Sequence, residues 1–251
     1  MTLWPEGAHL TIGLWFDRPV LPSALRAVGD ALEAEGGRYT GAVYVGPPAV
    51  PFDWVFDIEG LSHVHDAAAS AVRDRMADGT AYRVSMALPG VGPAALTFEG
   101  TPGAVLPASG HPVDVVMESD VLFIPPEHRD DDERAAAQAL QAAVLRYLEA
   151  CCTALDPAYA LVHVEEATPT PAALAAGGRL GGDVFVSRRL AGLDGLGTAL
   201  ADVARVSETL DWETGTFYSS DFLAETPDRP ALVAAWTAAS AVIADLLRHD
   251  R

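Results

Sequence analysis

The sequence contains no lysine. All 16 basic residues of the 251-residue chain are arginines, against 35 aspartates and glutamates, and the formal net charge is −19. Without lysine the chain cannot form a Schiff base with a carbonyl substrate or with pyridoxal phosphate, and it cannot complete a P-loop. A chain this acidic repels phosphate backbones and anionic lipid, so we expect neither nucleic acid nor a membrane surface as a partner.

Cysteine is almost as scarce. The only two, Cys151 and Cys152, are adjacent, and a disulfide framework needs separated cysteines that meet in space. We expect both to be reduced and at least partly buried. The first six residues lack the basic and apolar regions of a signal peptide, and no apolar run approaches the roughly 18 residues of a membrane span. These features predict a cytoplasmic protein.

Common catalytic and metal-binding patterns are also missing. The segment Ser219-Ser220-Asp221 lacks the Gly-x-Ser-x-Gly nucleophile elbow. The glycine-rich stretch 177–183 precedes a predicted strand, whereas phosphate-binding loops follow a strand and open a helix. His63 and His65 fall at a predicted helix start, where positions i and i+2 point apart. We therefore expect no metal and no cofactor.

Hydrophobic periodicity outlines the secondary structure. Alternating apolar residues and β-forming residues predict strands over 9–16, 38–45, 54–58, 82–88, 94–99, 113–118, 121–124, 159–165, 183–187 and 214–219. Helical spacing predicts helices over 21–32, 62–76, 130–151, 169–176, 196–206 and from Pro230 onward. The four acids of 130–133 complement the dipole of the longest helix, and its stripe Leu140, Val144, Leu148 and Cys151 is expected to be buried.

This order of elements predicts an α+β fold, with a mixed or antiparallel sheet packed against helices. Residues 1–107 and 108–251 share a rhythm of strand, helix and strand. The two segments are therefore predicted as an N-terminal and a C-terminal α/β half, arranged as a pseudo-duplication. One continuous domain around a single larger mixed sheet is the other arrangement consistent with the pattern.

One residue pair leaves an enzymatic function open. His163 and Glu165 lie on a predicted strand at positions that share a face, where a carboxylate can orient an imidazole as a general base. That interpretation predicts an enzyme of an uncatalogued family with a cleft between the two halves. The same pair also fits a pair of exposed polar residues on a non-catalytic protein. A structural or accessory subunit with an apolar interface is a third hypothesis.

The last third of the chain carries a resemblance to a known family. Gly215-Thr216-Phe217-Tyr218 is followed by a short acidic loop, and then Pro227-Asp228-Arg229-Pro230-Ala231-Leu232 opens a terminal amphipathic helix. This segment of about fifty residues resembles the C-terminal end of bacterial polymorphic-toxin immunity proteins, namely the immunity protein 52 family and related type VI immunity families. The resemblance implies a small, acidic, non-enzymatic cytoplasmic protein that binds and blocks one cognate toxin.

The charge favours the same class of function, because a field of this sign speeds encounter with a cationic surface. We therefore expect a basic protein partner, with the contact region near residues 211–228, where the resemblance lies. Aromatic side chains there are candidate anchors for a partner. The predicted partner-binding residues are Asp211, Trp212, Glu213, Phe217, Tyr218, Asp221 and Glu225.

Overall fold

The protein is built around one ten-stranded antiparallel sheet, which confirms the α+β prediction. The structure, a computed structural model, describes residues 5, 7–18, 24–48, 50–99, 104–105, 111–124, 126–193, 195–219 and 229–249. Across the sheet the strands run in the order β11-β12-β10-β9-β1-β8-β6-β5-β2-β4, and every pairing is antiparallel. Strands from both predicted halves share this sheet, because β1 lies between β8 and β9.

The ten strands are β1 (His9–Trp15), β2 (Arg38–Val45), β4 (Ser62–Val64), β5 (Ala81–Leu88), β6 (Gly92–Phe98), β8 (Val113–Glu118), β9 (Tyr159–Val164), β10 (Asp183–Ser187), β11 (Glu208–Asp211) and β12 (Gly215–Ser219). A separate two-stranded sheet pairs β3 (Pro51–Phe52) with β7 (Ala104–Val105). The α-helices are α1 (Ala24–Ala34), α2 (Ala69–Ala77), α3 (Asp120–Phe123), α4 (Asp131–Leu155), α5 (Pro171–Ala175), α6 (Arg188–Ala191), α7 (Leu196–Ala204) and α8 (Arg229–His249). The predicted boundary at 107/108 falls on residues outside the described ranges.

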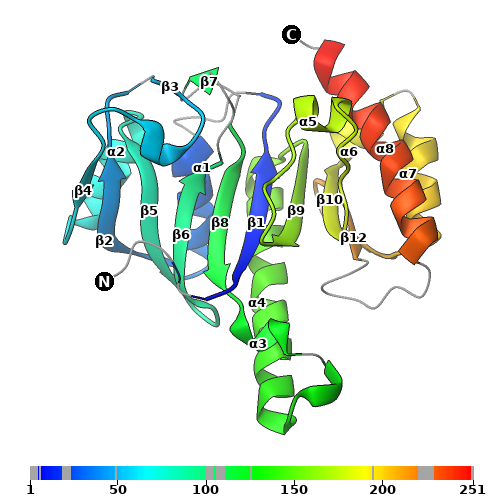
Figure 1. The fold of residues 1–251 in the computed structure, drawn as a ribbon, viewed down its shortest axis with the longest axis horizontal. Coiled ribbons are helices and arrows are strands. Elements are labelled where there is room, and N and C mark those ends of the chain that lie inside the picture. The colour runs from blue at the N-terminus through cyan, green and yellow to red at the C-terminus, as the bar shows by residue number, and fades with distance from the viewer. Residues whose placement is uncertain are drawn as a thin grey trace.

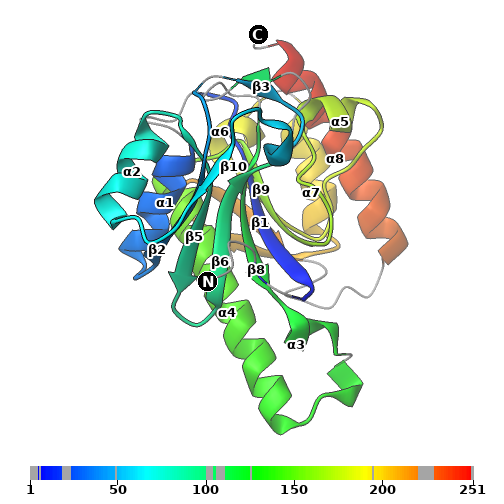
Figure 2. The same cartoon turned by 60° about the vertical axis from the view of Figure 1, so that its left-hand side comes forward.

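The helices cover opposite faces of the sheet at its two ends (Figures 1 and 2). One core cluster packs α1, α2 and α4 against the face that presents Leu10, Ile12 and Leu14 of β1. A second cluster packs α5, α6, α7 and α8 against the other face, which presents Val184 of β10. The alternation of side chains along each strand sends neighbouring residues to different clusters, so both faces are apolar where a helix covers them.

Helix α4 forms as its sequence predicts. The Asp130 carboxylate accepts a hydrogen bond from Glu133 N at 2.8 Å, and the Glu133 carboxylate accepts one from Asp130 N, also at 2.8 Å, which completes a capping box. The helix ends at Asp156, whose left-handed φ of 44° closes the C-terminal turn. The predicted stripe Leu140, Val144, Leu148 and Cys151 is buried, as is Cys152.

Helix α8 is the one helix among the described residues that is long and apolar enough to be compared with a membrane span. By length and composition alone, Arg229–Arg248 meets the requirements of a membrane span, with a mean hydropathy of 1.6. Core helices of soluble proteins meet the same requirements. Here the face that carries Trp236 and Ile243 is buried against the second core cluster. Within that window 39% of the residues are buried, so the helix packs one face on the sheet and leaves the other exposed.

Three predicted elements are wrong, and the strands β3, β4, β7 and β11 were not predicted. Residues 54–58 form a 3₁₀ turn at Val55–Asp57 instead of a strand, because the Asp57 side chain accepts a hydrogen bond from Trp54 N at 3.1 Å. The helix predicted from Ser62 begins only at Ala69, since Ser62–Val64 pairs with β2 as β4. Residues 121–124, expected to be extended, lie mostly in α3, and β11 carries too little apolar alternation to be recognised.

Candidate functional site

Strand β11 forms one end of the large sheet, beside the predicted contact region. It pairs with β12 on one side, and within the described residues no strand pairs with its outer side. All four of its residues are exposed, including Leu210. The hairpin between the two strands is closed by Trp212 N donating to Gly215 O at 2.9 Å. The Arg188 guanidinium donates a second hydrogen bond to this turn, to Trp212 O at 3.0 Å.

The predicted contact residues divide into two groups. Asp211 and Glu213 are exposed at this hairpin, and Asp211 accepts a hydrogen bond from Thr216 at 3.0 Å. Trp212, Phe217 and Tyr218 are buried instead. Trp212 and Phe217 stack with their ring centroids 4.9 Å apart inside the first core cluster, while Tyr218 meets a tryptophan of α8 in the second. Asp221 and Glu225 lie outside the described residues.

The position of the three aromatics has a consequence for binding. A buried ring contributes to the core and contacts a partner only if the hairpin first opens. Among the described residues of the predicted contact region, the exposed side chains are the carboxylates Asp211 and Glu213, beside the edge of β11. The sequence predicted Trp212, Phe217 and Tyr218 as anchors for a partner, but residue type alone does not distinguish a ring in the core from a ring at an interface.

A second group of polar residues is buried under the middle of the sheet. His163 Nε2 lies 2.9 Å from Thr168 Oγ1, and that hydroxyl donates to Asp114 Oδ1 at 2.8 Å. The three side chains are almost completely buried. Gly13 of β1 makes room for them, because a Cβ there would lie 1.7 Å from Thr168 Oγ1. The network therefore depends on a glycine at that position.

Burial shifts the pKa of both titratable groups in this network. Loss of water, together with the neighbouring Glu99 carboxylate, raises the pKa of Asp114 well above its usual value. Burial lowers the pKa of His163 to about 4, so its imidazole is neutral at neutral pH. With Nε2 engaged by Thr168, Nδ1 of His163 has no hydrogen-bond partner. The three side chains are thus joined by two hydrogen bonds through Thr168, and His163 keeps one ring nitrogen without a hydrogen-bond partner.

Two cavities lie beside this network, and the predicted catalytic residues His163 and Glu165 line different ones. His163 lines a cavity of about 440 Å³ together with Glu166, Arg179 and glycines of the 177–182 loop. Glu165 instead lines a smaller cavity of about 220 Å³ with Asp114, and its carboxylate accepts a hydrogen bond from His9 N at 2.6 Å. Glu165 follows β9 with a left-handed φ of 53°. Each member of the pair predicted to work together thus bonds to a different residue.

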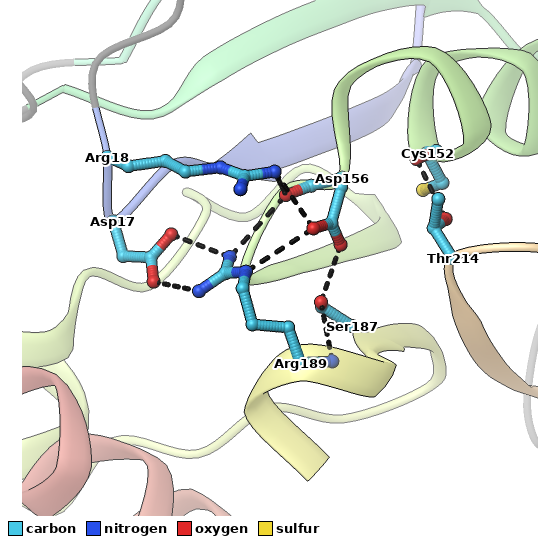
Figure 3. Close-up of polar contacts among 7 residues, drawn as sticks. All are labelled: Asp17, Arg18, Cys152, Asp156, Ser187, Arg189 and Thr214. Carbon is cyan, nitrogen blue, oxygen red and sulfur yellow. Dashed lines mark hydrogen bonds and ion pairs between the residues drawn. The ribbon is translucent and has the colours of Figure 1, made fainter. Parts of the chain in front are cut away.

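A third polar cluster joins segments that are far apart in the chain (Figure 3). The Arg189 guanidinium forms a bidentate ion pair with Asp17 and also contacts Asp156 Oδ2 at 3.3 Å. Arg18 reaches the same Asp156 oxygen at 2.8 Å, and Ser187 donates to Asp156 Oδ1 at 2.5 Å. These contacts connect the ends of β1, α4 and β10. Because the charged groups neutralise one another, the cluster fits a structural role in holding these segments together.

The other end of the sheet presents aromatic side chains to solvent. Trp54 and Phe56 are 56% and 46% exposed, and their rings meet edge to face at 4.9 Å. Tyr44 of β2 packs against Phe56 at 5.5 Å, and Arg83 lies 5.0 Å from the Phe56 ring. We call Tyr44, Trp54 and Phe56 the aromatic patch.

The two histidines beside this patch differ from expectation. His63 and His65 were expected to point apart on a helix, but His63 lies on β4, His65 follows directly after it, and their ring centroids are 3.6 Å apart. Burial and the neighbouring His65 lower the pKa of His63. Among the described residues no group of three or more His, Cys, Asp or Glu side chains is placed to hold a metal ion.

Some of these residues carried a signal in the sequence. Asp114 interrupts the apolar strand Val113–Glu118, and a charged residue in the middle of such a strand is a sign of a buried polar partner. Thr168 carries no such sign, since it lies in a loop among other small polar residues. Trp54 and Phe56 lie in residues 54–58, which the sequence predicted as a strand.

Comparisons with known proteins add little to this picture. No protein-family model matches the chain, and no curated protein matches it. Among solved structures it is similar to "Pseudomonas aeruginosa T6SS protein PA0821", with a TM-score of 0.44 and 12% sequence identity, over 96% of this chain and 83% of that chain.

Proposed function

We propose that this chain is a non-enzymatic, cytoplasmic binding protein that blocks a basic protein partner, as an immunity protein blocks its cognate toxin. The proposal is supported by charge, by the resemblance of the C-terminal segment to immunity proteins and by the exposed acidic hairpin. It does not rest on a catalytic arrangement, because His163 and Glu165 bond to different residues in different parts of the structure.

The observation that carries the proposal is the excess of carboxylates at the surface. Among the described residues, arginines that form ion pairs with carboxylates include Arg18, Arg26, Arg73, Arg134, Arg146, Arg189, Arg205 and Arg248, and each such pair takes up one charge of each sign. Such pairs leave the net charge of −19 unchanged, because the chain has 35 carboxylates and only 16 arginines. A field of this sign attracts a cationic surface over about one Debye length, roughly 8–10 Å at physiological salt.

The contact that we favour is the β11 hairpin. Glu208, Asp211 and Glu213 are exposed there, and no strand of the described part of the chain pairs with the outer side of β11. A basic segment that adds to this edge would gain main-chain hydrogen bonds along with ion pairs. The acidic side chains also discourage pairing between two copies of this edge, since like charges would then face each other.

The test begins with a pull-down from the native host and continues with association kinetics on the recovered protein. The edge variant combines Glu208→Gln, Asp211→Asn and Glu213→Gln. The control variant neutralises three exposed carboxylates elsewhere, Asp74→Asn, Asp132→Asn and Glu149→Gln, so both variants have the same net charge.

We expect both variants to slow association by similar factors, and only the edge variant to speed dissociation. Raising the salt concentration should slow association of the unmodified protein. Recovery of no protein partner, or of an acidic one whose binding ignores salt, would contradict the proposal. If the partner dissociates from both variants at the same rate, the partner is genuine but the β11 hairpin is not its contact.

A further inference from the structure

The aromatic patch is held outward by the turn beneath it. Val55 and Ile58 are buried in the first core cluster, whereas Trp54 and Phe56 in the same turn are exposed to solvent. Asp57 N donates to Trp54 O at 2.9 Å, and Ile58 N donates to Val55 O at 3.4 Å, which closes the turn. The two rings are thus presented on a backbone that is already fixed by the core, so little order is lost when a partner contacts them.

Exposure of this kind is unusual in the rest of the described chain. The other large apolar residues with comparable exposure are Leu193, Leu210 and Val233, which are aliphatic and lie at separate places. Single exposed apolar residues need no explanation, but two adjacent aromatic rings form a surface of the kind that anchors protein interfaces.

The charges around the patch indicate what it would bind. Asp53, Asp57 and Glu59 are exposed within five residues of the rings, so the local potential is negative. The faces of aromatic rings attract cations, most strongly tryptophan. The patch already holds one guanidinium, since Arg83 lies 5.0 Å from the Phe56 ring and 5.9 Å from the Tyr44 ring.

We propose that the aromatic patch, with Asp53, Asp57 and Glu59, binds an arginine-bearing segment of the basic partner, with a guanidinium stacked on Trp54. This inference rests on the proposed function and adds a second contact to it, one that supplies the aromatic anchors missing from the β11 hairpin. The two places are far apart: Tyr44 of the patch lies on β2, and eight strand spacings separate β2 from β11, which is about 38 Å across the sheet. Each can therefore be tested without disturbing the other.

The test uses a hexa-arginine peptide as the probe, with hexa-lysine and a neutral hexa-glutamine peptide for comparison. The readout is tryptophan fluorescence, and Trp54→Phe, which lacks only this indole, is the reference that identifies the emission of Trp54 among the five tryptophans. Trp15, Trp212 and Trp236 are buried, and Trp4 lies outside the described residues. Dissociation constants are measured for the unmodified protein and for Trp54→Ala, Phe56→Ala and Trp54→Phe. Leu193→Ala is the matched control, because it removes an exposed apolar side chain from another part of the surface. Binding to the variants that lack Trp54 is followed by calorimetry.

A stacked cation contributes about 0.5–2 kcal/mol, so loss of the Trp54 ring should weaken hexa-arginine binding by about 2- to 30-fold. Trp54→Phe should recover most of that loss, and Leu193→Ala should bind as the unmodified protein does. Hexa-lysine should bind more weakly than hexa-arginine, and hexa-glutamine should leave the Trp54 emission unchanged. Thermal melting checks that each variant is folded.

Unchanged hexa-arginine affinity in Trp54→Ala, or equal losses in Trp54→Ala and Leu193→Ala, would overturn this inference. The edge variant Glu208→Gln, Asp211→Asn, Glu213→Gln separates the two proposals. If the native partner binds and responds to that variant but not to Trp54→Ala, the proposed function stands and the aromatic patch is no anchor. If hexa-arginine binds at Trp54 while no protein partner is recovered from the host, the patch is a cation site and the proposed function fails.

Discussion

His163 should make the stability of this protein depend on pH in a way that a single substitution can isolate. Its imidazole is buried and neutral, with a pKa lowered from 6.5 to about 4 by loss of water. In the unfolded chain the same group binds a proton near its ordinary pKa. Acidification therefore favours the unfolded state, and the stability associated with neutral His163 is lost as pH falls from about 6.5 towards about 4.

The size of the effect follows from that interval. One pH unit corresponds to about 1.36 kcal/mol of differential proton binding, so the loss should reach about 2 kcal/mol at about pH 5 and about 3 kcal/mol at about pH 4. Asp114 acts in the opposite direction, because burial raises its pKa and its contribution to stability is lost as pH rises. The net pH dependence of the unmodified protein therefore contains both groups.

His163→Gln separates them. Glutamine does not titrate and retains an N–H that can donate to Thr168, so Asp114 and all surface groups contribute to both proteins alike. The free energy of unfolding is measured in urea at several pH values between about 7.5 and about 4. We expect the unmodified protein to lose about 3 kcal/mol more than the variant over this range. Parallel curves would refute the burial argument, as would an NMR titration of His163 near pH 6.5.

Three further changes test the packing directly by urea unfolding. Leu148→Ala should cost about 2–5 kcal/mol because the side chain is fully buried in the first core cluster, and a loss within about 0.5 kcal/mol would show that the site is in effect exposed. Gly13→Ala should cost about 1–3 kcal/mol or more, since its Cβ would displace Thr168; an unchanged stability would mean that the loop moves freely aside. Asp130→Ala should cost about 1 kcal/mol through loss of the cap to Glu133 N, whereas Asp130→Ser should retain most of it.

The sequence predicted the elements whose periodicity was long and regular. Helix α4 and the β5–β6 hairpin were located within a few residues, because a buried stripe or an alternating strand repeats enough times to be distinguished from chance. The short segments were predicted less well. In residues 54–58 the hydrogen bond from Trp54 N to the Asp57 side chain outweighs β-propensity, and a pattern of side-chain types does not reveal such a local contact.

The candidate site was harder to predict than the fold, for a physical reason. Trp212, Phe217 and Tyr218 look alike in sequence whether they face the core or a partner, and only the pairing of β12 with β10 and β11 places them inside. Asp114 and Thr168 meet across 54 positions of sequence, so their contact depends on the strand register. A prediction from periodicity identifies faces of single elements, whereas a polar network needs the order of strands across the whole sheet.

The overall charge and the aromatic patch would act over different ranges, so an acidic protein with buried aromatic residues at its predicted contact could still hold a partner. The field of −19 charges acts before contact and is weakened by salt, so it governs how often partners meet. A ring such as Trp54 acts only at contact, where its stacked cation is partly removed from water, so it governs how long they stay together. Neutralising distant carboxylates should therefore change association alone, while removing one exposed ring should change dissociation alone. A protein whose affinity came from charge only would respond to the first change and ignore the second.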